Sequence, residues 1–156
     1  MRILAGLLIT GLFILSTWFL SLFIGKKRSV EYVGPFVAKL AKFLVAISIP
    51  NIDKPEEFEV FKFRLKRRLS FWGPLYDISY VHEDINMIKL NILNCPVCEL
   101  FQKFGIMELS KYACEGDLAV ARDNSEKWEF SRTTEIGTGG QYCDNTFNRK
   151  GMLSGV

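Results

Sequence analysis

Residues 95–98 read Cys-Pro-Val-Cys, and they open the stretch of sequence that decides how this chain folds. Pro96 suits the first turn of a helix, because proline lacks the N–H that would be unpaired there, and Gly105 marks where that helix ends. The pattern predicts a helix that begins beside Cys95. The partial positive charge at a helix N-terminus favours a thiolate over a thiol, so Cys95 and Cys98 are candidates for a nucleophile or a metal ligand.

The other two cysteines of the chain follow in the same segment. Residues 114–117 read Cys-Glu-Gly-Asp, and residues 139–144 read Gly-Gly-Gln-Tyr-Cys-Asp. Cys114 and Asp117 are three residues apart in a predicted short helix, so they share one of its faces. We expect the four thiols to meet at one site, although small buried cysteines also pack as ordinary apolar residues.

The N-terminal segment is apolar and long enough to cross a bilayer, which takes about 20 residues of helix. No charged residue occurs from Ile3 to Gly25, and the cations of residues 26–28 follow directly. A secretory signal peptide would have a shorter apolar region and a cleavage site of small residues. The excess of cations after the segment predicts a single-pass membrane protein, with the lipid bilayer as a partner and the C-terminal domain in the cytoplasm.

The compartment decides how the cysteines are interpreted. In the reducing cytoplasm they indicate catalysis or metal binding, whereas in the opposite orientation two disulfides would be the default. Basic residues gather in 62–68, where they could contact anionic lipid headgroups. No aromatic interleaving or known binding motif accompanies them, so we expect no nucleic-acid partner.

The remaining segments predict an α+β fold, in which helices pack on an antiparallel sheet. Apolar residues recur at helical spacing in 30–49, with Pro35 near the first turn, and again in 56–72. One or two strands are expected in residues 75–93, with a break near residues 83–84. A C-terminal hairpin is expected from residues 127–136 and 142–148, around a glycine turn at 137–140. The chain then divides into a transmembrane anchor with a basic flank (residues 1–28), amphipathic juxtamembrane helices (29–74) and a cysteine-rich α+β domain (75–150).

The order and spacing of the chemical groups resemble the L-2-amino-thiazoline-4-carboxylic acid hydrolase family. The resemblance covers about residues 86–147 and rests on short pieces in order: Cys95-Pro96, Cys114 with Asp117, Arg132-Thr133, Gly139-Gly140, Cys143-Asp144 and Phe147. The chain departs from the family pattern at Asn145, where the family usually has Phe, and at Cys98, which is not part of the pattern.

The resemblance implies hydrolysis of a carbon–nitrogen bond in a small cyclic amidine-like substrate by cysteine and aspartate chemistry. A thiolate could attack the ring carbon, with Cys114 or Cys143 as candidates, and Asp117 could accept a proton or position water. Arg132 could hold the substrate carboxylate, and the Gly139 and Gly140 amides could face an oxyanion. The candidate catalytic residues are Cys95, Cys114, Asp117, Cys143 and Asp144.

Two other functions remain open at the level of sequence. Cys95, Cys98, Cys114 and Cys143 could bind zinc or an iron–sulfur cluster, but only one close Cys-x-x-Cys pair is present. The chain could also be a non-catalytic accessory subunit of a larger membrane complex, which would explain why a domain of this type carries an anchor.

Overall fold

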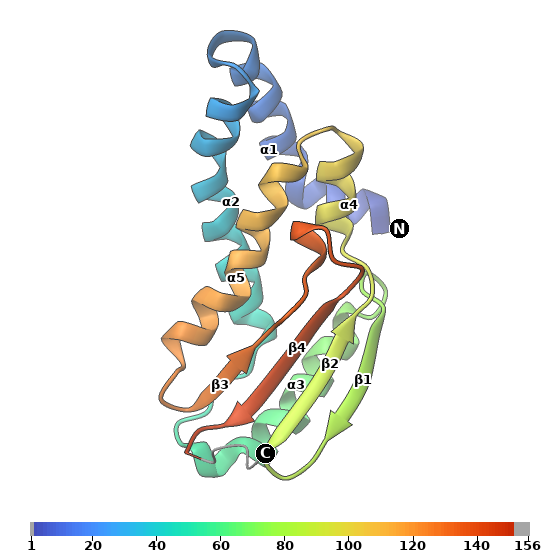
Figure 1. Ribbon diagram of the computed structural model, residues 1–156. Coiled ribbons are helices and arrows are strands. Elements are labelled where there is room, and N and C mark those ends of the chain that lie inside the picture. The colour runs from blue at the N-terminus through green and yellow to red at the C-terminus, as the bar shows by residue number, and fades with distance from the viewer. Residues whose placement is uncertain (1, 152–156) are drawn as a thin grey trace.

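The computed structural model describes residues 2–151, which form five α-helices and one four-stranded antiparallel sheet (Figure 1). The helices are α1 (Arg2–Ile24), α2 (Lys26–Ser48), α3 (Phe58–Trp72), α4 (Pro96–Lys103) and α5 (Ser110–Asp123). The strands are β1 (Ile78–Glu83), β2 (Met87–Ile92), β3 (Trp128–Ser131) and β4 (Cys143–Arg149). Short 3-10 helices are η1 (Pro55–Glu57), η2 (Met107–Leu109) and η3 (Ile136–Thr138). The predicted α+β class is confirmed.

The strands lie in the order β1-β2-β4-β3, and every neighbouring pair is antiparallel. In the β2–β4 pair, Cys143 lies opposite Ile92 and Asn145 lies opposite Leu90. Side chains alternate between the faces of a strand, so Cys143, Asn145 and Phe147 point to the same face. Helix α3 covers that face (Figure 1), and the core between them contains Phe58, Phe61, Leu65, Ile88, Leu90, Trp128 and Phe147.

Local sequence explains how β1 is followed by β2 and α4. The Asp84 carboxylate accepts hydrogen bonds from the backbone N–H groups of Asn86 (2.7 Å) and Met87 (2.8 Å), which closes the turn between β1 and β2. Helix α4 begins at Pro96 with Cys95 as its N-cap residue, and Gly105 lies beyond its end with a φ of 71°. Both the strand break near residue 84 and the helix start at residue 96 were predicted and are confirmed.

Helix α5 packs closely along α2 because a glycine lies at the contact. A Cβ added at Gly116 would lie 2.8 Å from the carbonyl carbon of Ala41 in α2. The two backbones can therefore approach only if residue 116 has no side chain. This contact holds α5, and with it Cys114 and Asp117, against the α2 helix.

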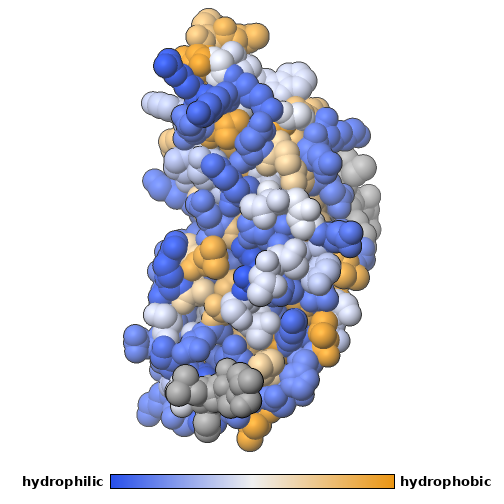
Figure 2. Space-filling view, in the orientation of Figure 1, coloured by the Kyte–Doolittle hydropathy of each residue, from blue (hydrophilic) through white to orange (hydrophobic). Residues whose placement is uncertain are grey.

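Helix α1 folds back along α2 instead of standing apart from the rest of the molecule (Figure 1). Its buried stripe contains Gly6, Thr10, Ile14 and Thr17. The Thr10 and Thr17 hydroxyls donate hydrogen bonds to carbonyl groups of their own helix. The outer surface is made of large apolar side chains, which include Leu8, Leu12, Leu15, Phe19, Leu22 and Phe23. Figure 2 shows apolar side chains gathered at the tip of the α1–α2 hairpin.

The predicted start of the second helix was wrong. Helix α2 begins at Lys26, directly after Gly25, and Pro35 lies inside it. A proline in a helix interior costs about 3 kcal/mol. Val30 and Val33 nevertheless pack in a core with Ile106 and Leu109, and this burial favours the longer helix.

The predicted C-terminal hairpin forms, but it is less regular than the sequence suggests. Strand β3 ends at Ser131, and η3 lies in the long connection to β4. The N–H groups of Thr133 and Thr134 donate to the Asp144 carboxylate instead of extending the β ladder. A side chain thus replaces the partner strand at this point.

The basic residues of α3 are mostly occupied within the molecule. Lys62 is buried and contacts Glu59 (2.7 Å), Lys66 pairs with Glu83 (2.9 Å), and Arg68 donates to the carbonyl groups of residues 47 and 49. The helix therefore stabilises the domain, and fewer of its cations are available to lipid headgroups than the sequence suggests.

Substituting Gly116 by alanine should destabilise the fold, because the new methyl group would meet the α2 backbone. Overpacking of this kind costs about 1–3 kcal/mol in the free energy of unfolding. Gly11→Ala is the matched control, since Gly11 is also helical and nothing lies within 4 Å of its Cβ position. There the helix propensity of alanine should stabilise by about 0.5–1 kcal/mol. Urea titration of the full chain in detergent measures both, and equal stabilities of the two variants would contradict the close-contact argument.

Candidate functional site

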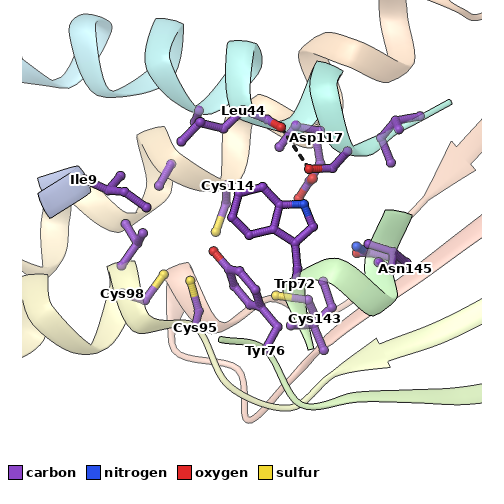
Figure 3. A pocket seen from close by; sticks show the side chains of 18 of the residues that line it. Ile9, Leu44, Trp72, Tyr76, Cys95, Cys98, Cys114, Asp117, Cys143 and Asn145 are labelled. Atoms are coloured by element: carbon purple, nitrogen blue, oxygen red, sulfur yellow. Dashed lines mark hydrogen bonds between the residues drawn. The ribbon is translucent and has the colours of Figure 1, made fainter. Parts of the chain in front are cut away.

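A cavity of about 190 Å³ lies between the sheet and the five helices (Figure 3). Most of its wall is aliphatic or aromatic. Its polar and reactive lining consists of Thr10, Ser48, Trp72, Tyr76, Cys95, Cys98, Cys114, Asp117, Cys143 and Asn145. The structure thus brings all four cysteines, from β4 and from the N-terminal parts of two helices, to one cavity together with Asp117.

Cys95 and Cys98 lie at the N-terminus of α4. The pKa of the Cys95 thiol is lowered by hydrogen bonding from the Cys98 thiol and from the backbone N–H groups of Cys98 and Val97, against the opposing effects of burial and of the Asp117 charge. The pKa of Cys98 is raised by hydrogen bonding with the sulfurs of Cys114 and Cys95 and by burial. Cys95 is therefore the thiol that is poised to ionise, and Cys98 is its donor.

Cys114 and Cys143 are buried, whereas Cys95 is only partly buried. Cys114 lies on α5, and a Cβ on Gly137 would come within 2.3 Å of its sulfur, so glycine is needed for η3 to pack there. Cys143 begins β4, and its sulfur accepts a hydrogen bond from the Ile136 N–H at 3.4 Å. Burial raises the pKa of Cys143 to about 12, which keeps that thiol protonated at neutral pH.

Asp117 is held in the cavity by Arg132. The guanidinium group donates to the Asp117 carboxylate at 2.7 Å and to the Cys114 carbonyl oxygen at 3.0 Å, and it also pairs with Glu135. Burial raises the pKa of Asp117, although the Arg132 charge and hydrogen bond act in the opposite direction. Arg132 itself is not part of the cavity wall. Its guanidinium group hydrogen-bonds to protein atoms, and this geometry suits a residue that positions the Asp117 carboxylate.

The predicted site residues outside the cavity wall hold the loop before β4. The Asp144 carboxylate accepts from the Thr133 N–H (2.8 Å), the Thr133 hydroxyl (2.7 Å) and the Thr134 N–H (2.7 Å). The Gly139 N–H donates to Ile136 and the Gly140 N–H to Glu135 within the turn. These amides are thus engaged in the turn itself.

Five residues of the polar lining were not among the predicted site residues: Thr10, Ser48, Trp72, Tyr76 and Asn145. Tyr76 follows α3 and gives no spacing signal, yet its hydroxyl group points toward the thiols (Figure 3), and burial raises its pKa. Asn145 was visible only as a departure from the family pattern. It lies on the cavity-facing side of β4, between Cys143 and Phe147.

Disulfide bonds and metal binding were the alternatives to catalysis for the four cysteines, and the geometry bears on both. All four are free thiols, so the disulfide interpretation is not supported. Across residues 2–151, no group of three or more histidine, cysteine, aspartate or glutamate side chains is placed to hold a metal ion. The zinc and iron–sulfur alternatives therefore gain no support.

Comparison with known proteins extends the resemblance toward the N-terminus. The sequence model of the L-2-amino-thiazoline-4-carboxylic acid hydrolase family matches residues 27–147. The matched region begins at α2, and it therefore includes the helices that share their cores with the sheet and with α4. No curated protein sequence matches the chain significantly.

Asp144→Asn should destabilise the protein above about pH 4 and much less at lower pH. Burial alone would raise the Asp144 pKa, but the hydrogen bonds from Thr134 and Thr133 outweigh it, so the folded-state pKa is lowered. A lowered folded-state pKa stabilises the protein above the unfolded pKa of about 3.9, and this stability is lost as pH falls through the folded-state value.

Charged hydrogen bonds of this kind contribute about 1.5–3 kcal/mol each, so we expect a loss of that order at pH 7. Urea titrations between pH 3 and pH 7 measure the effect. Asp53→Asn, at an exposed carboxylate in the linker before η1, is the control. A loss that is independent of pH would show that the Asp144 charge does not hold the loop.

Proposed function

Because this chain belongs to the L-2-amino-thiazoline-4-carboxylic acid hydrolase family, we propose that its cavity is a hydrolase site for a small cyclic amidine-like substrate. The reaction would break a carbon–nitrogen bond. The observation that carries the proposal is the position of Cys95, whose sulfur lies at a helix N-terminus and in the same cavity as Asp117. A nucleophile and a proton-transfer group in one water-poor pocket are what this chemistry requires.

Cys95 is the nucleophile in this proposal. Its thiol has a lowered pKa, whereas Cys98 and Cys143 have raised ones. A thiolate, and not a thiol, attacks an electrophilic carbon. Cys98 stabilises the thiolate by donating to it.

Asp117 is the proton donor and acceptor. Its raised pKa keeps part of the population protonated closer to neutral pH than an exposed aspartate would be. Arg132 fixes the position of the carboxyl group. Asp144 and the glycine turn hold the β4 end of the site, and they take no part in the chemistry.

The steps follow from these roles. The Cys95 thiolate forms a bond to the carbon of the amidinium group, and the electron pair of the C=N bond moves onto nitrogen. As the positive charge of the amidinium is lost, Asp117 takes up a proton from solvent and donates it to one nitrogen, which leaves as an amine with the electron pair of the broken C–N bond. Water adds to the carbon and gives a proton to the Asp117 carboxylate. Cys95 then leaves as a thiolate with the electron pair of the C–S bond. The new hydroxyl group becomes the carbonyl oxygen and gives its proton to the released amine, and Asp117 returns its own proton to solvent.

The position of the site relative to a membrane is part of the proposal. Gly6–Ile24 is long and apolar enough to cross a membrane by length and composition. The sequence predicts a single crossing with the domain in the cytoplasm, but α1 touches the domain near both of its ends: Gly6 packs on Leu100, and Trp18 donates to the Phe104 carbonyl. This packing supports an α1 that lies beside the domain with its apolar outer face in one leaflet.

The accessory-subunit function remains the second candidate. Its support is the apolar outer face of α1, which would fit a groove in another membrane subunit as well as it fits lipid. Other subunits that co-purify at fixed stoichiometry would favour it, and a chain that is active when purified alone would count against it.

Cys95→Ser should lower the rate of hydrolysis by at least about 100-fold, because a serine hydroxyl has no comparable tendency to ionise. Cys143→Ser should keep the rate within a few-fold, since its sulfur is protonated and bonded to Ile136. The measurement is mass-spectrometric detection of ring-opened product from 2-amino-thiazoline and from its 4-carboxylate, with the full chain in detergent. Unchanged turnover in Cys95→Ser would remove Cys95 as the nucleophile.

Short epitope tags on the two termini should be digested from the same side of sealed vesicles. In the folded-back arrangement α1 does not cross the bilayer, so both ends remain on the side of the domain. Protease treatment of the vesicles, with and without detergent, measures this directly. Protection of one tag alone would establish the single crossing instead.

A further inference from the structure

The cavity has no cation for a substrate carboxylate. Of the cavity-lining residues that the structure describes, Asp117 is the only one with a charged side chain. The nearby Arg132 uses its guanidinium for Asp117, the Cys114 carbonyl and Glu135. Burying an unpaired carboxylate beside Asp117 would be strongly unfavourable. An anionic ligand therefore does not fit this site, although a carboxylate appears in the name of the family.

Asn145 gives the cavity a polar group that is not used within the protein. The residue as a whole is only 4% exposed. Its Oδ1 atom has no hydrogen-bond partner in residues 2–151. A buried acceptor without a partner costs about 1–3 kcal/mol. An N–H group of a ligand would satisfy it.

The walls around Asn145 are apolar and leave room for a hydrocarbon group. Leu65, Leu69, Ile78, Leu90 and Phe147 line this part of the cavity. Figure 3 shows Asn145 at the end of the cavity that lies away from Cys98. The whole cavity has a volume of about 190 Å³, compared with roughly 150 Å³ for an apolar cavity that binds benzene. The amidine head and the apolar substituent share this volume, so the substituent can be at most about the size of a single ring.

We infer that the site takes a neutral or cationic amidine-type ligand that carries an apolar substituent in place of a carboxylate, with Asn145 Oδ1 accepting a hydrogen bond from a ligand N–H. The inference takes from the proposed function only that the ligand is amidine-like. It identifies Asn145 as a specificity-determining residue. Asp117 supplies the negative charge that favours the cationic form.

Binding of three probes tests the inference without relying on turnover. The probes are 2-amino-thiazoline, its 4-phenyl derivative and its 4-carboxylate, titrated by calorimetry into the full chain in detergent, in a Cys95→Ser background that prevents consumption. We expect the phenyl derivative to bind at least 10-fold more tightly than the parent compound, and the carboxylate at least 10-fold more weakly. A carboxylate that binds as tightly as the parent, or no binding of any probe at millimolar concentration, would overturn the inference.

Asn145→Leu removes the amide at nearly constant volume, and it should weaken binding of the parent and the phenyl derivative by about 10-fold, the equivalent of one hydrogen bond. Asn91→Leu is the matched control, because Asn91 Oδ1 is also buried without a partner in the described chain but lies outside the cavity wall. If Asn145→Leu and the unsubstituted protein bind these two probes equally tightly, the role of Asn145 is refuted. The order of the affinities of the three probes for the protein that retains Asn145 decides the ligand class, even if the leucine variant does not fold.

The two proposals can fail separately. The expected order of affinities with no hydrolysis of any probe would leave the ligand class standing and remove the hydrolase. Cys95-dependent hydrolysis with a preference for the carboxylate would leave the hydrolase and overturn the ligand class.

Discussion

The buried guanidinium group of Arg132 joins the segments on which the site depends. It contacts Asp117 and the Cys114 carbonyl on α5, and Glu135 beside η3. A buried cation is stable only when it is paired and hydrogen-bonded, so none of these partners can move away without a large cost. The chain between β3 and β4 is thereby fixed against α5. The thiol of Cys143, at the end of that connection, is held in the same cavity as the other three.

Sequence reasoning predicted the features that follow from local chemistry. The helix start at Pro96 and the strand break at Asp84 depend on proline geometry and on a side chain that bonds to nearby backbone, and both can be read from a few residues. Pro35 was misinterpreted because its place in α2 is decided by burial of residues far apart in the chain. Arg132 was expected to bind substrate, yet nothing in its local sequence reveals that its donors are already taken. Tyr76 reaches the cavity only through the packing of α3.

In α1 the polar and apolar side chains are distributed in the opposite way to those of a helix in a water-soluble domain. Its small and hydroxyl-bearing residues are buried against the rest of the molecule, and many of its large apolar residues face outward. Threonine hydroxyls that bond within their own helix cost little in an apolar environment, and small residues allow close helix contact where lipid surrounds the outer face. Ile9 and Phe13 on the same helix line the cavity. One helix thus forms both an apolar outer surface and a wall of the pocket.

In the proposed mechanism, electrostatics connects the Cys95 thiol with the kind of ligand that it would attack. The charge on Asp117 opposes ionisation of Cys95, as does burial, and only the donors at the start of α4 offset them. A second anion in this cavity would add to that opposition and would favour the unreactive thiol. A cationic amidinium group has the reverse effect, because its charge stabilises the thiolate and the Asp117 carboxylate together. Binding of such a ligand would therefore increase the fraction of Cys95 that is ionised at the moment when its electrophilic carbon arrives, so that recognition and activation depend on the same charge.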